Sequence, residues 1–574
     1  MTPTGNSAEV LIVGAGPTGL TLACDLARRG VPFRIIDQQE QPSQHSKALA
    51  IHARTLECFE QLELTDDLCR RGRRIHALNL YADGQCIARF DFQHLDTPYP
   101  FALVLPQNET EQFLIERLTL LGERVERPNQ LETLEFLREN IMAIIQDPRS
   151  NQRRDPQAVS WVVGCGGARS AVRTCLEIPF EGERYDESFL LGDLTVNGDL
   201  PSDEAHVFLS PNGVLLAIPL PWEDCYRLVV DETHQSLRKV DADITIQDFQ
   251  DYWRQRVGRE SGSRNVLSQL CWHSQFRIAR RLVRSYRKGH VLLAGDAAHV
   301  HSPVGGQGMN TGIQDAFNLG WKLALVSGGY SRESLLDTYE QERRPVAASL
   351  LSGTHWGTKL ITLRHPVSRW VRNHLVTLVS QSQVFQQRMV HALAELDTQY
   401  PQSPIVRAQQ INTTVKQKWK TRIFSGRGAL NATAPPDVGE RAPDVSFRQA
   451  DMKVCRLSQF LRSPHHTMLI FIGRTLPRES QPMLENLHDL IGKAFVPNVR
   501  ILVVQTANDQ SNLHPECSII RDSDGTLHLR NGADLEQCCV YVIRPDGYVG
   551  YKSQPIEVTQ LQQYFSKIIL SPSS

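Results

Sequence analysis

The feature that most constrains the fold is a glycine-rich turn close to the start of the chain. Val10–Val13 is an apolar run, and Gly-Ala-Gly-Pro-Thr-Gly follows at 14–19. A helix then ends at Gly30, and Phe33–Ile36 forms a second strand that ends in Asp37, 18 positions after the last glycine of the motif (37 − 19). That is near the spacing at which an acidic side chain meets a ribose hydroxyl. The pattern predicts a β-α-β unit that binds FAD or NAD. Its predicted binding residues are Gly14, Gly16, Pro17, Thr18, Gly19 and Asp37.

A second glycine-rich stretch runs from His290 to Leu319. Its apolar start predicts a buried strand, which stops at Gly295-Asp296, and a helix is expected from about Gly308-Met309. Glycine allows a backbone to approach a flat ligand, and a helix start directs unpaired N–H groups at it. A flavin ring suits this loop, and Asp296 would bind its ribityl chain. The alternative is an ordinary strand-to-helix connection. The predicted contacts are Asp296, Gly305, Gly306, Gly308, Met309 and Asn310.

Together the two stretches describe opposite ends of one long ligand, FAD. The run GDAAHVHSPVGGQGMNTGIQDAFNLGWKL and the GAGPTG motif resemble those of the single-component FAD-dependent aromatic hydroxylases, the para-hydroxybenzoate hydroxylase-like group. The closer resemblance is to the phenol and polyketide hydroxylase branch, which carries an extra C-terminal domain. The resemblance implies hydroxylation of a phenolic or aromatic substrate through a flavin hydroperoxide, with FAD bound, O2 consumed and NAD(P)H visiting transiently.

The resemblance also suggests further site residues. Lys47 stands where the family usually has an arginine near the pyrophosphate, and Gln107 matches a glutamine at a helix start. For Gln107 the residues alone favour a position just outside a helix cap. Arg169 matches a family arginine, and the loop backbone at Pro303, Gly305 and Gly306 is expected to face the reacting atoms. His301 and Arg343 are predicted to be structural, and no metal site is predicted.

One position departs from the family pattern. The strand Trp161–Val163 runs into Gly-Cys-Gly-Gly-Ala-Arg-Ser at 164–170, where the family has Asp-Gly in contact with FAD and the nicotinamide cofactor. Gly166 takes the place of the aspartate. The loss of a carboxylate removes a hydrogen-bond acceptor, worth on the order of 1 kcal/mol, and is expected to weaken the use of NAD(P)H.

We expect an α/β fold with a discontinuous Rossmann-like FAD-binding domain at 1–184 and 281–400. Short alternating strands between them predict an antiparallel substrate-binding sheet at 185–280, with a hairpin turn at 211–213. The sequence does not identify the groups of this sheet that contact the substrate. The candidates, by residue type only, are Tyr226, Trp222, Phe208 and His206. From about Ser334 to Tyr400 the pattern is helical.

A linker is expected at 401–443 and a thioredoxin-like domain at 444–574. The domain is predicted from strands at 468–472 and 500–504, a helix at 481–490, a hairpin at 540–551 and a helix at 558–569. Because no C-x-x-C motif follows its first strand, the sequence does not favour a redox role for this domain. A role in forming a dimer is the better interpretation.

With 62 basic and 63 acidic residues, the net charge is 62 − 63 = −1, so nothing points to nucleic acid or an anionic membrane. The polar start and the lack of long apolar runs lead us to expect a cytoplasmic protein, with small-molecule partners and a possible homodimer. Two alternatives stay open. One is another FAD oxidoreductase, such as a reductase or a Baeyer–Villiger monooxygenase, and the other is a degenerate flavin-binding scaffold.

Overall fold

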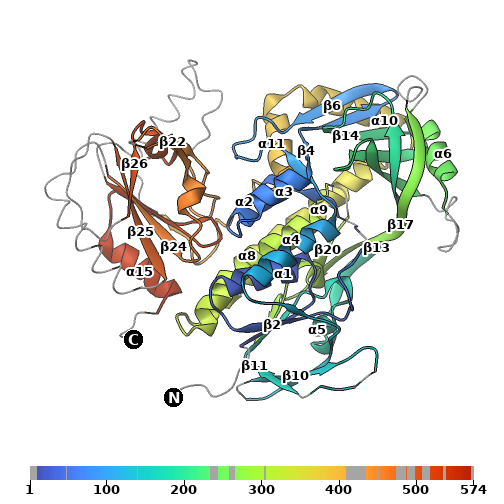
Figure 1. The fold of residues 1–574 in the computed structure, drawn as a ribbon. Helices are drawn as coiled ribbons and strands as arrows, with labels where there is room; N and C mark the ends of the chain where they lie inside the picture. The colour runs from blue at the N-terminus through green and yellow to red at the C-terminus, as the bar shows by residue number, and fades with distance from the viewer. Residues whose placement is uncertain are drawn as a thin grey trace.

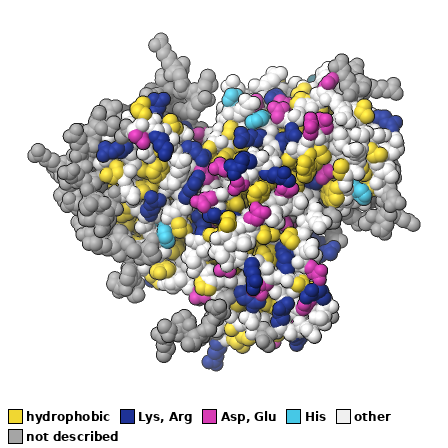
Figure 2. Space-filling view, in the orientation of Figure 1, with side chains coloured by type: hydrophobic (Ala, Val, Ile, Leu, Met, Phe, Trp, Pro, Cys, Tyr) yellow, Lys and Arg dark blue, Asp and Glu magenta, His cyan; other side chains and the backbone are white. Residues whose placement is uncertain are grey.

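The computed structural model describes residues 9–44, 46, 48–138, 140–150, 152–154, 156–232, 244–257, 265–302, 305–408, 435–449, 451–472, 487, 491, 495, 498–506, 518–533 and 538–570. An eight-stranded sheet and two six-stranded sheets, one of them in the C-terminal region, are joined by helices (Figure 1). None of the described helices combines the length and the hydropathy that a membrane crossing requires. Basic and acidic side chains are interspersed on the face in Figure 2, as the near-zero net charge suggests.

The first sheet is the predicted Rossmann-like sheet, with strand order β18-β19-β12-β1-β2-β8. Its centre is β1 (Val10–Val13), which pairs in parallel with β2 (Phe33–Ile36) and with β12 (Trp161–Gly164). β12 pairs in parallel with β19 (Val291–Leu293). The edge strands are β8 (Val125–Glu126), parallel to β2, and β18 (Arg287–Lys288), antiparallel to β19. Parallel pairing places the carboxyl ends of β1, β12 and β19 at one edge, although these strands are far apart in the chain.

Three helices form a layer on this sheet: α1 (Pro17–Ala27), α4 (Gln107–Leu120) and α8 (Gly308–Ser327) (Figure 1). Their apolar faces join the strands in one buried core. α1 and α8 are closely packed, because a Cβ atom on Gly312 of α8 would lie 2.4 Å from Thr18 Oγ1 of α1. The starts of α1 and α8 therefore lie side by side at the sheet edge.

The second sheet has the order β20-β17-β13-β16-β15-β14-β5-β6. Its strands are β5 (Ala77–Ala82), β6 (Gln85–Asp91), β13 (Phe180–Asn197), β14 (Glu204–Ser210), β15 (Gly213–Pro219), β16 (Cys225–Glu232), β17 (Val266–Val283) and β20 (His299–Val300). Its pairs are antiparallel except β14 with β5, and the predicted hairpin joins β14 to β15. One face is covered by α6 (Ile246–Arg256).

This sheet differs from the expected one in two ways. Two of its strands, β13 and β17, have 18 residues each and are not short. β5, β6 and β20 also come from outside 185–280, so the sheet uses more of the chain than the proposed domain bounds contain. We propose the same bounds of 185–280 for the sheet domain, with β5 and β6 added to it.

Long helices close the other side of the second sheet: α9 (Asp337–Ile361), α10 (Pro366–Ser380) and α11 (Gln383–Leu393). They correspond to the helical region expected from about Ser334 to Tyr400. α10 and α11 pack against β6.

The C-terminal sheet has the order β21-β28-β27-β24-β25-β26. Its strands are β21 (Arg407–Ala408), β24 (His466–Phe471), β25 (Val499–Thr506), β26 (Ser518–Asp522), β27 (Cys539–Ile543) and β28 (Val549–Ser553). β24 is parallel to β25 and antiparallel to β27, and α15 (Val558–Ile568) packs on one face. This arrangement confirms the thioredoxin-like topology. Residues 409–434 of the predicted linker lie outside the described residues. The predicted helix 481–490 also lies outside them, except for Leu487.

Candidate functional site

Three glycine-lined turns meet at the carboxyl edge of the Rossmann-like sheet. The turn after β1 has Gly14 at φ +108°, and a Cβ atom there would lie 2.6 Å from the carbonyl oxygen of Cys165 in the turn after β12. Gly19 packs equally closely, since its Cβ atom would lie 2.0 Å from Gly14 O. Gly16, in contrast, has no atom within 4 Å of the place that a Cβ atom would take. Gly14 and Gly19 therefore shape the turn, while Gly16 and Pro17 at the start of α1 leave room for a pyrophosphate.

Asp37 closes the first turn at the end of β2. One of its carboxylate oxygens accepts a hydrogen bond from Ala15 N at 2.8 Å, and the other accepts one from Gln39 N at 2.8 Å. Arg127, just after β8, donates to the same carboxylate at 3.1 Å. Arg127 was not among the predicted site residues; its only signal in the sequence is a basic residue following a short strand beside β2. The pair places one cation and one anion at the expected ribose end of FAD.

At the flavin end, Asn310 holds three segments together. Its buried side chain donates to Ala50 O at 2.8 Å and to Gly306 O at 3.0 Å, and accepts from His52 N at 2.9 Å. It lies in the first turn of α8, but its side chain is engaged with protein groups. The structure therefore places Asn310 as a brace for the loop, with only its backbone left for the ligand.

The glycine loop before α8 is partly described. Gly305 and Gly306 have φ of +90° and +64°, a region that favours glycine. Gly305 O accepts a hydrogen bond from His52 Nε2 at 2.9 Å, and burial lowers the pKa of His52 to about 4, so its ring is neutral near pH 7. His52 was not predicted from the sequence. Two predicted site residues, Pro303 and Lys47, lie outside the described residues.

The remaining predicted residues lie around the same space. Gln107 begins α4, where its N–H donates to Ser46 Oγ at 2.8 Å, and its side chain donates to Glu111 at 2.8 Å. Asp296 and Arg169 are exposed at its rim, and Met309 lies at the start of α8. Gly166 has φ −78°, and the nearest atom to a Cβ there would be 3.6 Å away. An aspartate therefore fits at position 166 without strain.

All these turns open into one cavity of about 1820 Å³. It is bounded on one side by the glycine turns and on the other by the second sheet. The cavity face of that sheet is largely aliphatic; the residues that line it there include Leu78, Leu80, Phe189, Leu191, Ala205, Val207, Val214, Leu216, Ile218 and Val229. α9 and α11 complete the wall, with Leu350, Thr354, Phe385 and Met389 among the residues they contribute.

None of the four residues suggested by type lines this cavity. Phe208 and Tyr226 are buried on the opposite face of the sheet, against α6, and Tyr226 donates to Leu200 O at 2.9 Å. His206 lies beside Tyr81, also away from the cavity, and Trp222 is exposed. Successive side chains of a strand point to opposite faces, so Val207 and Arg227 face the cavity instead.

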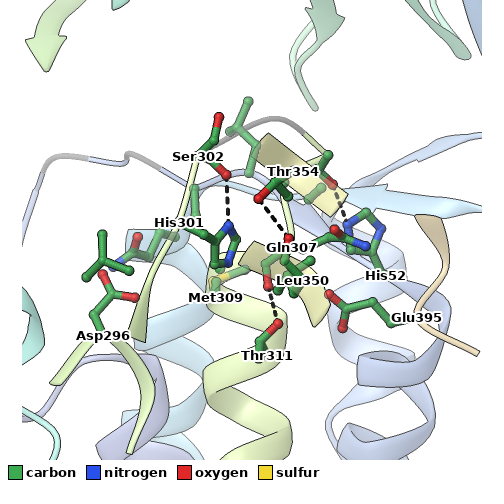
Figure 3. Close-up of a pocket in the computed structure, with 18 of the residues that line it drawn as sticks. His52, Asp296, His301, Ser302, Gln307, Met309, Thr311, Leu350, Thr354 and Glu395 are labelled. Atoms are coloured by element: carbon green, nitrogen blue, oxygen red, sulfur yellow. Dashed lines mark hydrogen bonds between the residues drawn. The ribbon is translucent and has the colours of Figure 1, made fainter. Parts of the chain in front are cut away.

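A few polar groups interrupt the apolar wall (Figure 3). His301 is half-buried, its Nδ1 lies 2.8 Å from the acceptor Ser302 O, and desolvation lowers its pKa to about 4. Glu395, which follows α11, is 6 % exposed, and burial raises its pKa to about 8. Arg343, predicted to be structural, pairs with Asp315 at 2.6 Å. Nothing in the local sequence marked Glu395, because it becomes part of the site only through the packing of α11.

The geometry fits FAD. Gly16 and the start of α1 offer space and N–H groups to a pyrophosphate, and the start of α8 faces the far end of the same cavity. Within the described residues, no group of His, Cys, Asp and Glu is arranged to hold a metal ion.

Comparison with known proteins agrees with this geometry. Residues 7–354 match the FAD binding domain family, and residues 499–573 match the phenol hydroxylase C-terminal dimerisation domain. A 6-methylpretetramide 4-monooxygenase of Streptomyces rimosus is 40% identical over 370 residues, which cover 64% of this chain and 65% of that relative. A pentachlorophenol 4-monooxygenase of Sphingobium chlorophenolicum is 31% identical over 551 residues, 95% of this chain and 94% of that one. A solved anhydrotetracycline hydroxylase from Streptomyces rimosus superposes with a TM-score of 0.70 at 26% identity, covering 98% of both chains.

Proposed function

The chain belongs to the family of FAD-dependent aromatic monooxygenases, and from that premise we propose that it hydroxylates an uncharged phenol built of several rings, using NAD(P)H and O2. The observation that carries this proposal is the long aliphatic face of the second sheet, opposite the glycine turns in one cavity. The similar proteins include a 6-methylpretetramide 4-monooxygenase and a pentachlorophenol 4-monooxygenase, so relatives of this chain are named for different aromatic compounds.

The charges of the cavity favour an uncharged substrate. Arg227 is the buried cation on the sheet face, but Asp193 accepts from its Nε at 2.6 Å and its Nη2 at 2.7 Å, and Ser46 O accepts from Nη1 at 2.8 Å. Its guanidinium is therefore fully engaged. Among the residues that the structure describes, the other Lys and Arg side chains that line the cavity are those of Arg169 and Lys359, and both are exposed. A substrate carboxylate bound against this apolar wall would lose its water shell and find no free cation to pair with, so its binding would be unfavourable.

FAD supplies the redox chemistry, and the protein contributes binding, position and the exclusion of water. We propose that Gly16, Pro17, Thr18 and Asp37 hold the ADP end, with Arg127 beside Asp37. At the flavin end, Asp296 and the N–H groups of Gly308 and Met309 face the ring system, where the positive end of α8 favours negative charge. His52 and Asn310 fix the loop that carries Gly305 and Gly306, whose backbone faces the reacting atoms.

The direct test is an oxygen-labelling experiment. The purified yellow protein is incubated with NADPH, 18O2 and anhydrotetracycline or 2-naphthol, and the product is examined by mass spectrometry. One labelled oxygen in a hydroxylated ring is the expected result. Consumption of NADPH with every ring substrate but without labelled product would contradict hydroxylation and favour a reductase. Flavin that stays oxidised under NADPH or NADH would favour a scaffold.

Replacement of Gly166 by aspartate is expected to improve the use of NADPH. The added carboxylate restores an acceptor on the nicotinamide side of the cavity, and the site has room for it. One charged hydrogen bond of roughly 1.5 kcal/mol corresponds to about a tenfold faster reduction at low NADPH. Stopped-flow flavin reduction measures this rate. An unchanged or lower rate would show that Gly166 does not limit the reaction with the nicotinamide.

A polar residue on the aliphatic wall should weaken substrate binding without affecting FAD. Leu216→Asn introduces an amide where a ring is expected to pack. The lost apolar burial plus amide desolvation, about 2–3 kcal/mol, predicts a KM raised about 30- to 150-fold. Leu120→Asn on α4, where Leu120 is 79% exposed, is the matched control and should leave KM unchanged. Equal loss of FAD from both variants would contradict the separation of the two binding regions.

We also propose that the C-terminal unit forms a homodimer contact. Support comes from the match of residues 499–573 to a dimerisation domain. Sedimentation of the full chain should give twice the mass of 64.8 kDa, and a monomer at micromolar concentration would contradict the proposal.

A further inference from the structure

Glu395 combines features that the proposed function has not used. Its side chain is 6 % exposed, lies on the wall of the cavity, and follows the last turn of α11. In Figure 3 its carboxyl end points toward the centre of the view, where Gln307 and Thr311 lie. A buried carboxyl group normally has partners for both oxygens, so each oxygen has to be traced.

The two oxygens of Glu395 differ. Oε2 accepts a hydrogen bond from Gln314 Nε2 of α8. Oε1 is buried and has no hydrogen-bond partner among the residues that the structure describes. A buried polar atom without a partner costs free energy, and Glu395 is one of the residues that line the cavity proposed to bind FAD and substrate. The arrangement therefore leaves one oxygen available to a bound molecule.

The cation that faces Glu395 is engaged with other groups. Arg343 on α9 donates to Asp315 Oδ1 at 2.6 Å, to Tyr400 Oη at 3.0 Å and to Thr311 O at 3.1 Å. Asp315 on α8 and Asp397 after α11 are anions that also face the group, and Gln314 is neutral. Burial raises the pKa of Glu395 to about 8, and Arg343 and Gln314 offset this only in part. Near pH 7 the carboxyl group is therefore mostly protonated, and because Oε2 accepts from Gln314, the proton is on Oε1.

The backbone places Glu395 at the end of α11. Its φ of +58° is the left-handed conformation that often ends a helix, and Leu396 N donates to His391 O at 3.0 Å, which closes the last turn. Glycine is the usual residue at such a position, so the glutamate side chain is not required by the backbone.

We propose that Glu395 is a positioning residue: its Oε1–H donates a hydrogen bond to a carbonyl or hydroxyl oxygen of the ring system bound in the cavity. The oxygen belongs to the substrate or to the flavin, since both carry oxygen atoms bonded to ring carbons. This rests on the proposed function and deepens it, because it gives the substrate class an oxygen acceptor on the side of α11. A protonated carboxyl group can act as a donor near neutral pH when an apolar site raises its pKa.

The test is a binding titration that needs no turnover. FAD-loaded protein is titrated with 1-tetralone, a two-ring ketone that does not ionise, from pH 6 to 9.5. Apoprotein is titrated with FAD in the same way. The variants are Glu395→Met, which removes the donor at similar volume, and Glu395→Gln, which keeps a donor but cannot ionise.

For the wild type, the affinity of the responding ligand should be flat from pH 6 to 7 and about tenfold weaker at pH 9, because Oε1 loses its proton as pH rises through about 8. His52 and His301, whose pKa values are about 4, stay neutral in this range. Glu395→Met should bind about tenfold more weakly at pH 7. Glu395→Gln should bind within about threefold of the wild type at pH 7 and show no loss at pH 9.

A matched control is Glu116→Gln. Glu116 is an exposed carboxylate that accepts from Gln112 Nε2 at 2.8 Å, so the same chemical change is made away from the cavity. It should change neither titration. A response with tetralone alone assigns the oxygen to the substrate, and a response with FAD alone assigns it to the flavin. The proposal is overturned if neither titration responds to Glu395→Met and pH, or if Glu395→Gln loses as much affinity as Glu395→Met. Failure of the proposed function would appear elsewhere, as wild-type protein that yields no labelled product.

Discussion

Gly14→Ala is expected to give a colourless protein that binds FAD at least 100-fold more weakly than the wild type. Gly14 has φ +108°, which costs alanine about 1–3 kcal/mol. The new methyl group would also lie 2.6 Å from Cys165 O and 2.7 Å from Gly166 Cα, both backbone atoms that cannot rotate away. The turns after β1 and β12 must therefore separate, and this moves the N–H groups at the start of α1 from the pyrophosphate. Titration of apoprotein with FAD, followed by flavin fluorescence, measures the effect.

Gly30→Ala separates backbone strain from steric overlap. Gly30 has φ +70°, but nothing lies within 4 Å of a Cβ atom there. It caps the end of the helix that Gly14 precedes, at the opposite end from the predicted ligand. This variant should lose about 1 kcal/mol of stability and keep its FAD. If Gly14→Ala remains yellow with unchanged FAD affinity, the close contact of the two turns does not shape the coenzyme site.

The glycine turns could be predicted from sequence because each motif is local. A strand, a turn residue and a helix start follow one another within 10 to 20 positions, and the required φ values are reserved largely for glycine. The two motifs, including the turn before α8 in the second of them, accordingly lie together around one cavity. Their adjacency follows from the parallel pairing of β1, β12 and β19.

The substrate wall could not be predicted in the same way. β15 is apolar on both faces, because Leu215 and Ala217 pack against α6 while Leu216 and Ile218 face the cavity. Strands buried on both sides lose the alternation that would assign a face, so a choice by residue type selected Tyr226 and Phe208 on the wrong face. His52, Arg127 and Glu395 were missed for a related reason. Each reaches the site through tertiary packing, and no motif in its own segment marks it.

Tertiary packing also joins the C-terminal unit to the rest of the protein through a buried charge cluster. Arg544, in the β27–β28 hairpin, donates to Glu342 of α9 at 2.6 and 2.8 Å and to Asp546 at 3.1 Å. Lys322 of α8 donates to Glu342 at 2.7 Å, and all four side chains are at most 2% exposed. Burial alone would raise the pKa of Glu342, but Arg544 and Lys322 hold it far below its usual range. Burial lowers the pKa of Lys322 to about 8. The cluster lies where the C-terminal unit meets α8 and α9, beside α2 (Ala53–Glu60), whose Arg54 donates to Asp546 O at 2.7 Å (Figure 1).

Arg544→Met should therefore destabilise the protein by about 3–5 kcal/mol, because it leaves Glu342 and Asp546 buried with Lys322 as the remaining cation in the cluster. Urea unfolding followed by circular dichroism measures the loss, and hydrogen exchange of β27 and β28 shows where it occurs. Without Arg544 the cluster holds two anions and one cation, so adding Glu342→Gln removes the excess negative charge and should recover part of the stability. Arg254→Met, which breaks an exposed pair with Asp251, should leave the unfolding midpoint unchanged. If Arg544→Met unfolds at the same urea concentration as Arg254→Met, the cluster does not hold the C-terminal unit in place, and the apolar contacts of Trp321 with that unit must do so instead.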